Sequence, residues 1–119
     1  MKYYTVVICK RDKNGEYTEK DALHFLNENT AEITHRATVC ELSQQLGIPV
    51  VYSDFVLIGD YTVRLIKNLP VIYYNINNCD EVVKVSFNKT EIEKSINEMN
   101  NLGDNCRFEQ YPKKFEDIE

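Results

Sequence analysis

The stretch of sequence that decides the fold class is FVLIGDYTVRLI, residues 55–66. Two runs of β-branched, aromatic and aliphatic residues flank the pair Gly59-Asp60. Glycine at the first position of a two-residue turn favours the type II′ geometry, which matches the twist of antiparallel strands. The stretch therefore predicts a β-hairpin with strands at 55–58 and 61–66.

Strand patterns continue on both sides of this hairpin. Residues 71–76 and 82–87 are rich in β-branched and aromatic residues, and short polar turns precede each run. In the run 82–87 the valines alternate with Lys84 and Ser86, which predicts that the valines face the core. The short connections predict a four-stranded antiparallel meander. Residues 3–10 predict a further strand, apolar on both faces, that joins the same sheet.

Three segments have helical patterns. A short one runs from Thr18, as N-cap, to Leu26. A longer one begins after Asn29, as N-cap, and ends at Gly47, where a left-handed residue is expected before Pro49. The last begins after Asn88 and ends at Gly103. The apolar face of the longer helix consists of Ala31, His35, Val39, Leu42 and Leu46.

These elements predict an α+β fold in a single domain spanning residues 1–119. Its antiparallel sheet, formed by the N-terminal strand and the four-stranded meander, would be packed by two to three helices. Residues 104–119 form a polar C-terminal tail. Two states of this tail stay open: an extended segment docked on the sheet, or a frayed end.

Composition limits the function classes. The chain has 119 residues and a formal net charge of −5, which disfavours direct nucleic-acid binding. No apolar run reaches the roughly 18 residues of a membrane span, and the first residues do not form a signal peptide. We therefore expect a cytoplasmic protein that does not bind membranes. The four cysteines, which include no C-x-x-C pair, are expected to be free thiols. They are Cys9, Cys40, Cys79 and Cys106.

One segment is similar to a DNA-binding motif. Residues 39–48 resemble the first helix and turn of a helix-turn-helix, and the hairpin after them would be the wing. The recognition helix would then begin near Pro49, in sequence that is β-branched and aromatic. No lysine or arginine occurs from Ala37 to Val63, although phosphate contacts need positive charge. A winged-helix-like nucleic-acid binder is therefore the least favoured alternative.

No motif of catalysis or cofactor binding is present. The histidines and cysteines lack the spacing of metal sites, and the sequence has no glycine-rich phosphate loop, so we expect no metal and no cofactor. A binding protein is favoured over an enzyme, although Cys40 or Cys79 would be the nucleophile of one. A second alternative is a small-molecule or nucleotide-binding domain, with a pocket near His35, Tyr52 and Tyr73.

The favoured function is recognition of a protein partner through an acidic surface that carries tyrosines. Tyrosine is enriched at interfaces because its large ring has a polar tip. The composition is similar to that of small inhibitors or regulators, such as immunity proteins and phage-encoded antagonists, so a basic nucleic-acid enzyme is one expected partner. Whether the chain also forms a homodimer stays open at this point. The expected partner-binding residues are Tyr52, Asp54, Asp60, Tyr73, Tyr74, Asp80 and Glu81.

Overall fold

A computed structural model describes residues 1–118 of the chain. In that range the chain forms seven strands and two helices, which confirms the predicted α+β fold. The strands lie in two antiparallel sheets of four and three strands, rather than in the single predicted sheet. The chain divides into two compact units: the larger unit is residues 2–69 with the segment from Phe115 onward, and the smaller unit is Met1 with residues 70–114. That residues 1–119 form a single domain stays a prediction.

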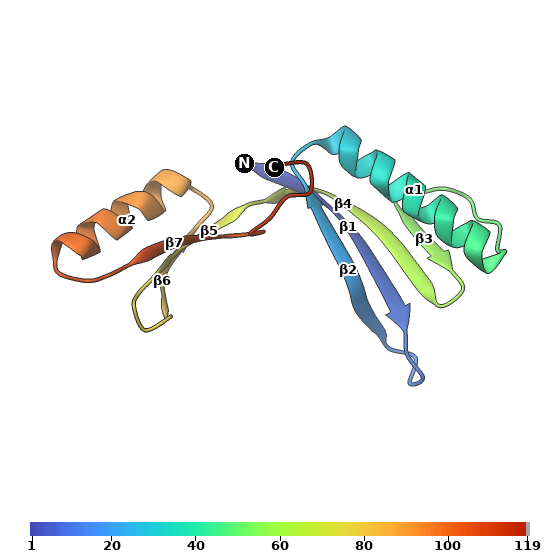
Figure 1. Cartoon of the computed structure of the whole chain (residues 1–119), viewed down its shortest axis with the longest axis horizontal. Helices are drawn as coiled ribbons and strands as arrows, with labels where there is room; N and C mark the ends of the chain where they lie inside the picture. Colours follow the sequence, from blue (N-terminus) through green and yellow to red (C-terminus); the bar gives the residue numbers. More distant parts are fainter. Residues whose placement is uncertain (119) are drawn as a thin grey trace. The chain divides into compact units, whose positions relative to one another are not determined.

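The larger unit is a four-stranded sheet with one helix along one of its faces (Figure 1). The strand order is β2-β1-β4-β3. The elements are β1 (Lys2–Arg11), β2 (Tyr17–Phe25), α1 (Glu28–Leu46), β3 (Phe55–Ile58) and β4 (Tyr61–Pro70). The predicted hairpin is confirmed, because β3 and β4 pair from Phe55 opposite Arg64 to Ile58 opposite Tyr61. Gly59 in its turn has φ 59°, the left-handed conformation that glycine adopts without steric cost.

The short helix predicted from Thr18 is wrong, because these residues form β2. The turn that ends at Gly15 returns the chain antiparallel to β1, from Arg11 opposite Tyr17 to Tyr4 opposite Phe25. A helix of two turns is marginal without tertiary support, whereas this ladder satisfies the backbone along its whole length. It also lets alternate residues of β2 reach the core.

Helix α1 begins two residues earlier than predicted and ends where predicted. Asn27, rather than Asn29, is the N-cap, and its side chain accepts a hydrogen bond of 3.1 Å from the Thr30 N–H. At the other end Gly47 has φ 67°, and the Ile48 N–H donates to the Ser43 carbonyl at 3.1 Å. The core between α1 and the sheet consists of Val6, Phe25, Ala31, Val39, Val56, Ile58, Val63 and Leu65.

The smaller unit is a three-stranded sheet with strand order β6-β5-β7, packed by one helix (Figure 1). Its elements are β5 (Ile72–Ile76), β6 (Val82–Ser86), α2 (Lys89–Asn101) and β7 (Arg107–Tyr111). The predicted meander is therefore wrong between β4 and β5, because β5 pairs with β6 and β7 and β4 pairs with β1 and β3. The N-cap of α2 is Asn88, as predicted.

The two faces of β6 are the reverse of the prediction. Lys84 forms an ion pair with Glu91 of α2, and the Ser86 hydroxyl donates to the same carboxylate at 2.6 Å. Helix α2 thus lies on the polar face of β6, and Val85 on the opposite face is 55% exposed. The reason is the neighbouring strand: the Asn75 amide of β5, on the same face as Lys84, donates to Ser95 Oγ of α2 at 3.0 Å.

The C-terminal tail contributes to both units. Its first part is β7, which pairs with β5 from Arg107 to Tyr111. Its last part belongs to the larger unit, where the Glu116 N–H donates to the His24 carbonyl at 2.8 Å. Asp117 accepts from the N–H groups of Leu26 and Asn27. The described part of the tail is docked, as in the first of the two predicted states, but only Arg107–Tyr111 is a strand, and residues 116–117 form a turn.

Candidate functional site

The sheet of the larger unit has a second face, opposite α1, which we call the open face. Alternate residues of each strand reach it, because successive side chains of a strand point to opposite sides. On β3, Val56 and Ile58 are buried under α1, whereas Phe55 is 49% exposed and Leu57 is 57% exposed. The open face contains a hollow of about 400 Å³, lined by Val7, Cys9, Tyr17, Phe55, Leu57, Thr62, Arg64 and Ile66.

The hollow is apolar over most of its lining. Its aliphatic and aromatic residues come from all four strands, so the sheet itself fixes their positions. An apolar patch of this kind on a small protein marks an interaction surface more often than single scattered residues do. The hollow is the best candidate for a functional site in the described part of the chain.

The other end of the open face is covered by the chain itself. Phe115 is buried there, with its ring edge-on to Tyr3 at 6.1 Å between centroids. Tyr3 in turn contacts the His24 ring, and the Thr5 hydroxyl lies 2.8 Å from His24 Nδ1. Phe115, from the C-terminal segment, is thus docked on the open face at the end away from the hollow.

Arg64 gives the hollow its charge. Its guanidinium lies over the Phe55 ring, 5.1 Å from the centroid, an arrangement that stabilises a cation through the ring quadrupole. The structure shows no carboxylate paired with Arg64 among residues 1–118. The hollow therefore combines apolar walls with one guanidinium whose N–H groups are available to an acceptor.

A second polar cluster joins α1 to the segment before β3. His35 is buried, and its Nε2 lies 3.2 Å from the Val63 carbonyl oxygen, which accepts only. Nε2 therefore carries the proton, so Nδ1 accepts from the Tyr52 hydroxyl at 2.7 Å. Arg36 lies over the Tyr52 ring at 4.4 Å. Both ring nitrogens of His35 are used internally, which assigns this cluster to stability.

The two histidines are expected to make the protein less stable in acid. Burial lowers the pKa of both His24 and His35, against weaker opposing effects of neighbouring groups such as Glu19 and Asp54. The unfolded chain titrates near a pKa of about 6.5, so below that pH it binds more protons than the folded chain. The contribution of the two histidines to the free energy of unfolding should therefore be complete above about pH 6.5. It should be lost progressively as the pH drops towards the pKa values of the folded protein.

Urea unfolding at about pH 7.5 and about pH 5.5 measures this effect. The variant His35→Gln keeps a donor and an acceptor without a titratable group, so it should lose less stability between the two pH values than the wild type. Equal losses in the two proteins would contradict the assignment to His35.

The structure separates the seven residues expected to bind a partner. Tyr52, Asp54 and Asp60 belong to the larger unit, and the other four to the smaller unit. Tyr52 is engaged with His35, and Asp60 forms an ion pair with Arg11 at 2.8 Å. None of the three lines the hollow. The alternative pocket near His35, Tyr52 and Tyr73 draws on residues of both units, and the described contacts join only His35 and Tyr52.

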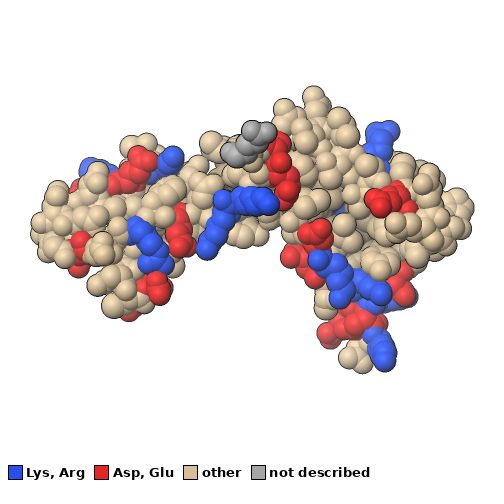
Figure 2. All heavy atoms as spheres, in the orientation of Figure 1, with Lys and Arg blue, Asp and Glu red and all other residues tan. Residues whose placement is uncertain are grey.

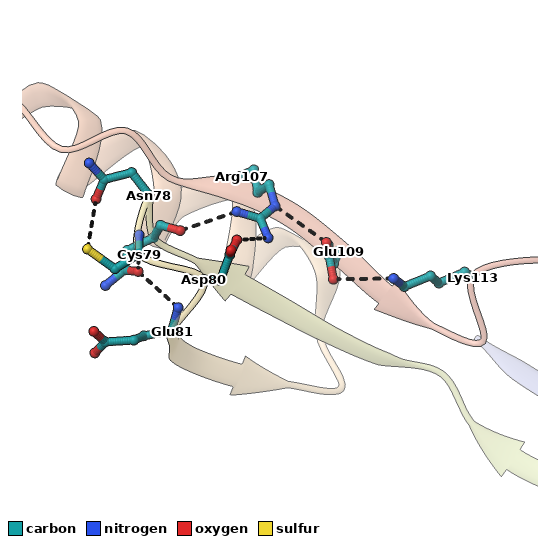
Figure 3. A network of polar contacts seen from close by, with 8 residues as sticks. Asn78, Cys79, Asp80, Glu81, Arg107, Glu109 and Lys113 are labelled. Atoms are coloured by element: carbon teal, nitrogen blue, oxygen red, sulfur yellow. Dashed lines mark hydrogen bonds and ion pairs between the residues drawn. The ribbon is translucent and has the colours of Figure 1, made fainter.

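In the smaller unit Tyr73 is buried, with its ring 5.8 Å from that of Phe108, and Tyr74 is half-buried. Arg107 binds the turn between β5 and β6, because its guanidinium donates to Asp80 at 2.7 Å and to the Asn77 carbonyl (Figure 3). Figure 3 shows the Glu81 carboxylate pointing away from this network. Asp80 therefore stabilises the turn, whereas the Glu81 carboxylate forms no ion pair with another described residue.

Sequence reasoning missed the residues that line the hollow. The signal that could have found them is that both faces of the strands at 3–10 and 55–58 are apolar, whereas the described chain has one helix in this unit, which covers one face. Two apolar faces and one covering helix leave one face open. The tyrosine of the hollow is Tyr17, which directly precedes Thr18, the predicted N-cap of the short helix.

The four cysteines lie in different environments. Cys9 lines the hollow, Cys106 is buried, and Cys40 and Cys79 are exposed, all as free thiols. Residues 1–118 contain no cluster of three or more His, Cys, Asp or Glu side chains that could hold a metal ion. Residues 47–54 form no helix, so the second helix of the helix-turn-helix is not formed.

Charge is not gathered by sign on the face shown in Figure 2, where acidic and basic side chains are interspersed over each unit. Neither helix of the described residues has the length and apolar character needed to cross a membrane. The apolar hollow is therefore a more distinct feature of the surface than any charged patch in that view.

Comparison of the chain with protein-family models, with curated proteins and with solved structures found no match in any of the three.

Proposed function

We propose that this protein is a small protein-binding regulator, of the inhibitor type, that contacts its partner through the hollow of the open face. The observation that carries this proposal is the hollow itself, about 400 Å³ in volume and lined mainly by apolar residues. Phe55 and Leu57 remain about half exposed there. Covering them with a partner removes apolar surface from water, which is the main favourable contribution to most protein association.

The residue types of the hollow support a protein partner. The centres of protein interfaces are enriched in Tyr, Phe and Arg, and Tyr17, Phe55 and Arg64 are of these types. They project from paired strands, so little side-chain and backbone freedom is lost on binding. The net charge of −5 would speed encounter with a basic cytoplasmic partner.

The variant Leu57→Asp tests the proposal, with Leu102→Asp as the matched control. Leu57 lies in the hollow, and Leu102 is 84% exposed at the end of α2 in the smaller unit. Random peptides displayed on phage would be selected on the wild-type protein and their affinities measured by calorimetry. Peptides that bind the hollow should lose at least about tenfold in affinity to Leu57→Asp, because the new carboxylate must be desolvated.

The same peptides should bind Leu102→Asp as they bind the wild type, and both variants should keep the wild-type circular dichroism spectrum. Failure to enrich any peptide, or equal affinity for wild type and Leu57→Asp, would refute the proposal.

A small apolar ligand is the second candidate, favoured by the volume of the hollow, which lies within the range of about 300–1,000 Å³ found for ligand sites. The variants Leu57→Asp and Leu102→Asp also distinguish a small apolar ligand from a protein partner. A metabolite that raises the melting temperature of the wild type and of Leu102→Asp, but not of Leu57→Asp, would favour it, provided that no peptide is enriched.

A further inference from the structure

Arg64 lines the hollow, and its guanidinium is available to bind an acceptor. It lies directly opposite Phe55 in the β3–β4 ladder, and its guanidinium lies over the Phe55 ring. No carboxylate of the described residues pairs with its N–H groups, so these groups are available. Those N–H groups match the two oxygens of a carboxylate.

The pairing of the other arginines makes this one distinctive. Arg11 is paired with Asp60 at 2.8 Å and Arg107 with Asp80 at 2.7 Å. Arg36 lies over Tyr52, on the side of α1 rather than in the hollow. Arg64 is thus the one arginine of the described chain that lines an apolar hollow without an internal carboxylate.

We propose that the hollow binds a large apolar side chain of the partner that is adjacent to a carboxylate, and that this carboxylate pairs with Arg64. This inference rests on the proposed function and specifies the chemistry that the partner must offer. The apolar side chain would contact Phe55 and Leu57. The carboxylate would form charge-assisted hydrogen bonds with the guanidinium, which are stronger than neutral ones.

The open face already holds a segment of this chemistry in the same chain. Phe115 is buried against Tyr3 and is followed by Glu116 and Asp117. Glu116 donates its N–H to the His24 carbonyl, and the Asp117 carboxylate accepts from two backbone N–H groups. An aromatic residue followed by acidic residues is therefore compatible with this sheet surface. The volume of the hollow, at the small end of the range for ligand sites, suits a short segment.

The acidic net charge of the protein does not oppose this contact. Exposed charges act through salt over about 8–10 Å, so the overall charge influences encounter with the partner. A carboxylate in contact with Arg64 experiences mainly the guanidinium. The partner can therefore be basic as a whole and still present one carboxylate to the hollow.

Three peptide probes test the inference. The first is GSFEGS with both termini blocked, the second has lysine in place of the glutamate, and the third has alanine in place of the phenylalanine. Each is titrated to about 1 mM, where binding of about −4 kcal/mol is detectable, into the ¹⁵N-labelled full chain. We expect the shifts to be largest at the amides of residues 55–66, and the first peptide to bind at least about tenfold more tightly than either of the others.

The variant Arg64→Met should abolish the preference for glutamate over lysine while the preference for phenylalanine over alanine persists. Arg36→Met is the matched control, because it removes an arginine that also lies over an aromatic ring but outside the hollow, and it should leave both preferences unchanged. If the first peptide does not bind, or if Arg64→Met keeps the glutamate preference, the inference is wrong. The proposed function is tested separately by the display experiment. It stands if the affinity of the selected peptides depends on Leu57, and it fails if their affinity does not.

Discussion

Replacing His35 by alanine is expected to lower the free energy of unfolding by about 3–5 kcal/mol. The side chain is fully buried at the centre of the face that α1 presents to the sheet. Its removal leaves a cavity and takes away two hydrogen bonds, one to the Tyr52 hydroxyl and one to the Val63 carbonyl. Urea unfolding followed by circular dichroism measures the loss.

The variant Tyr52→Phe is the control that separates the hydrogen bond from the cavity. It removes only the hydroxyl that donates to His35 and should cost about 1 kcal/mol, the usual net value of one hydrogen bond. The double variant should cost less than the two single losses together, because both remove the same bond. A loss below about 1 kcal/mol for His35→Ala would show that the imidazole is not a structural member of the core.

The elements with local signals were predictable from the sequence. The hairpin of β3 and β4 was identified from the pair Gly59-Asp60, because the turn type depends on these residues alone. The end of α1 at Gly47 and the start of α2 after Asn88 were identified for the same reason. In each case one residue satisfies backbone groups next to it, so distant contacts do not alter the result.

The partition of the strands into two sheets was not predictable. The sequence predicts β1 and the strands from β3 to β6, but the neighbour of β4 is β1, more than fifty residues earlier in the chain. Nothing local distinguishes this pairing from a meander into β5. The same limit explains β2, because Leu23 and Phe25 are recognised as core residues of a strand only when its pairing with β1 is known.

The candidate site was hidden for a related reason. Phe55 and Leu57 belong to a fully apolar strand, so the sequence alone assigns them to a core. They become a surface only because α1 covers the other face and Phe115 covers the far end of the same face. The opposite holds for Tyr73. The sequence predicts it to be a partner-binding residue, whereas the structure buries it against Phe108.

Replacing Ile92 by alanine is expected to cost about 2–5 kcal/mol and to act first on the smaller unit. Ile92 is fully buried and is the one buried residue of α2. The core of this unit is small, and its other buried apolar residues are Val71, Tyr73, Ile76, Cys106 and Pro112. The loss of one large aliphatic side chain should therefore remove much of what attaches α2 to the sheet. Amide hydrogen exchange would show it as reduced protection in β5 and α2.

The matched variant in the larger unit is Ile58→Ala, because Ile58 is also fully buried and belongs to the core under α1. It should reduce protection in β1 and β4 by a similar free energy, since the same atoms are removed from a similar environment. The pair also tests the prediction of a single domain. If each variant lowers protection only in its own unit, the two units unfold separately. If both variants lower protection equally throughout residues 1–118, the chain unfolds as one cooperative domain, because a shared transition transmits a local loss to every amide.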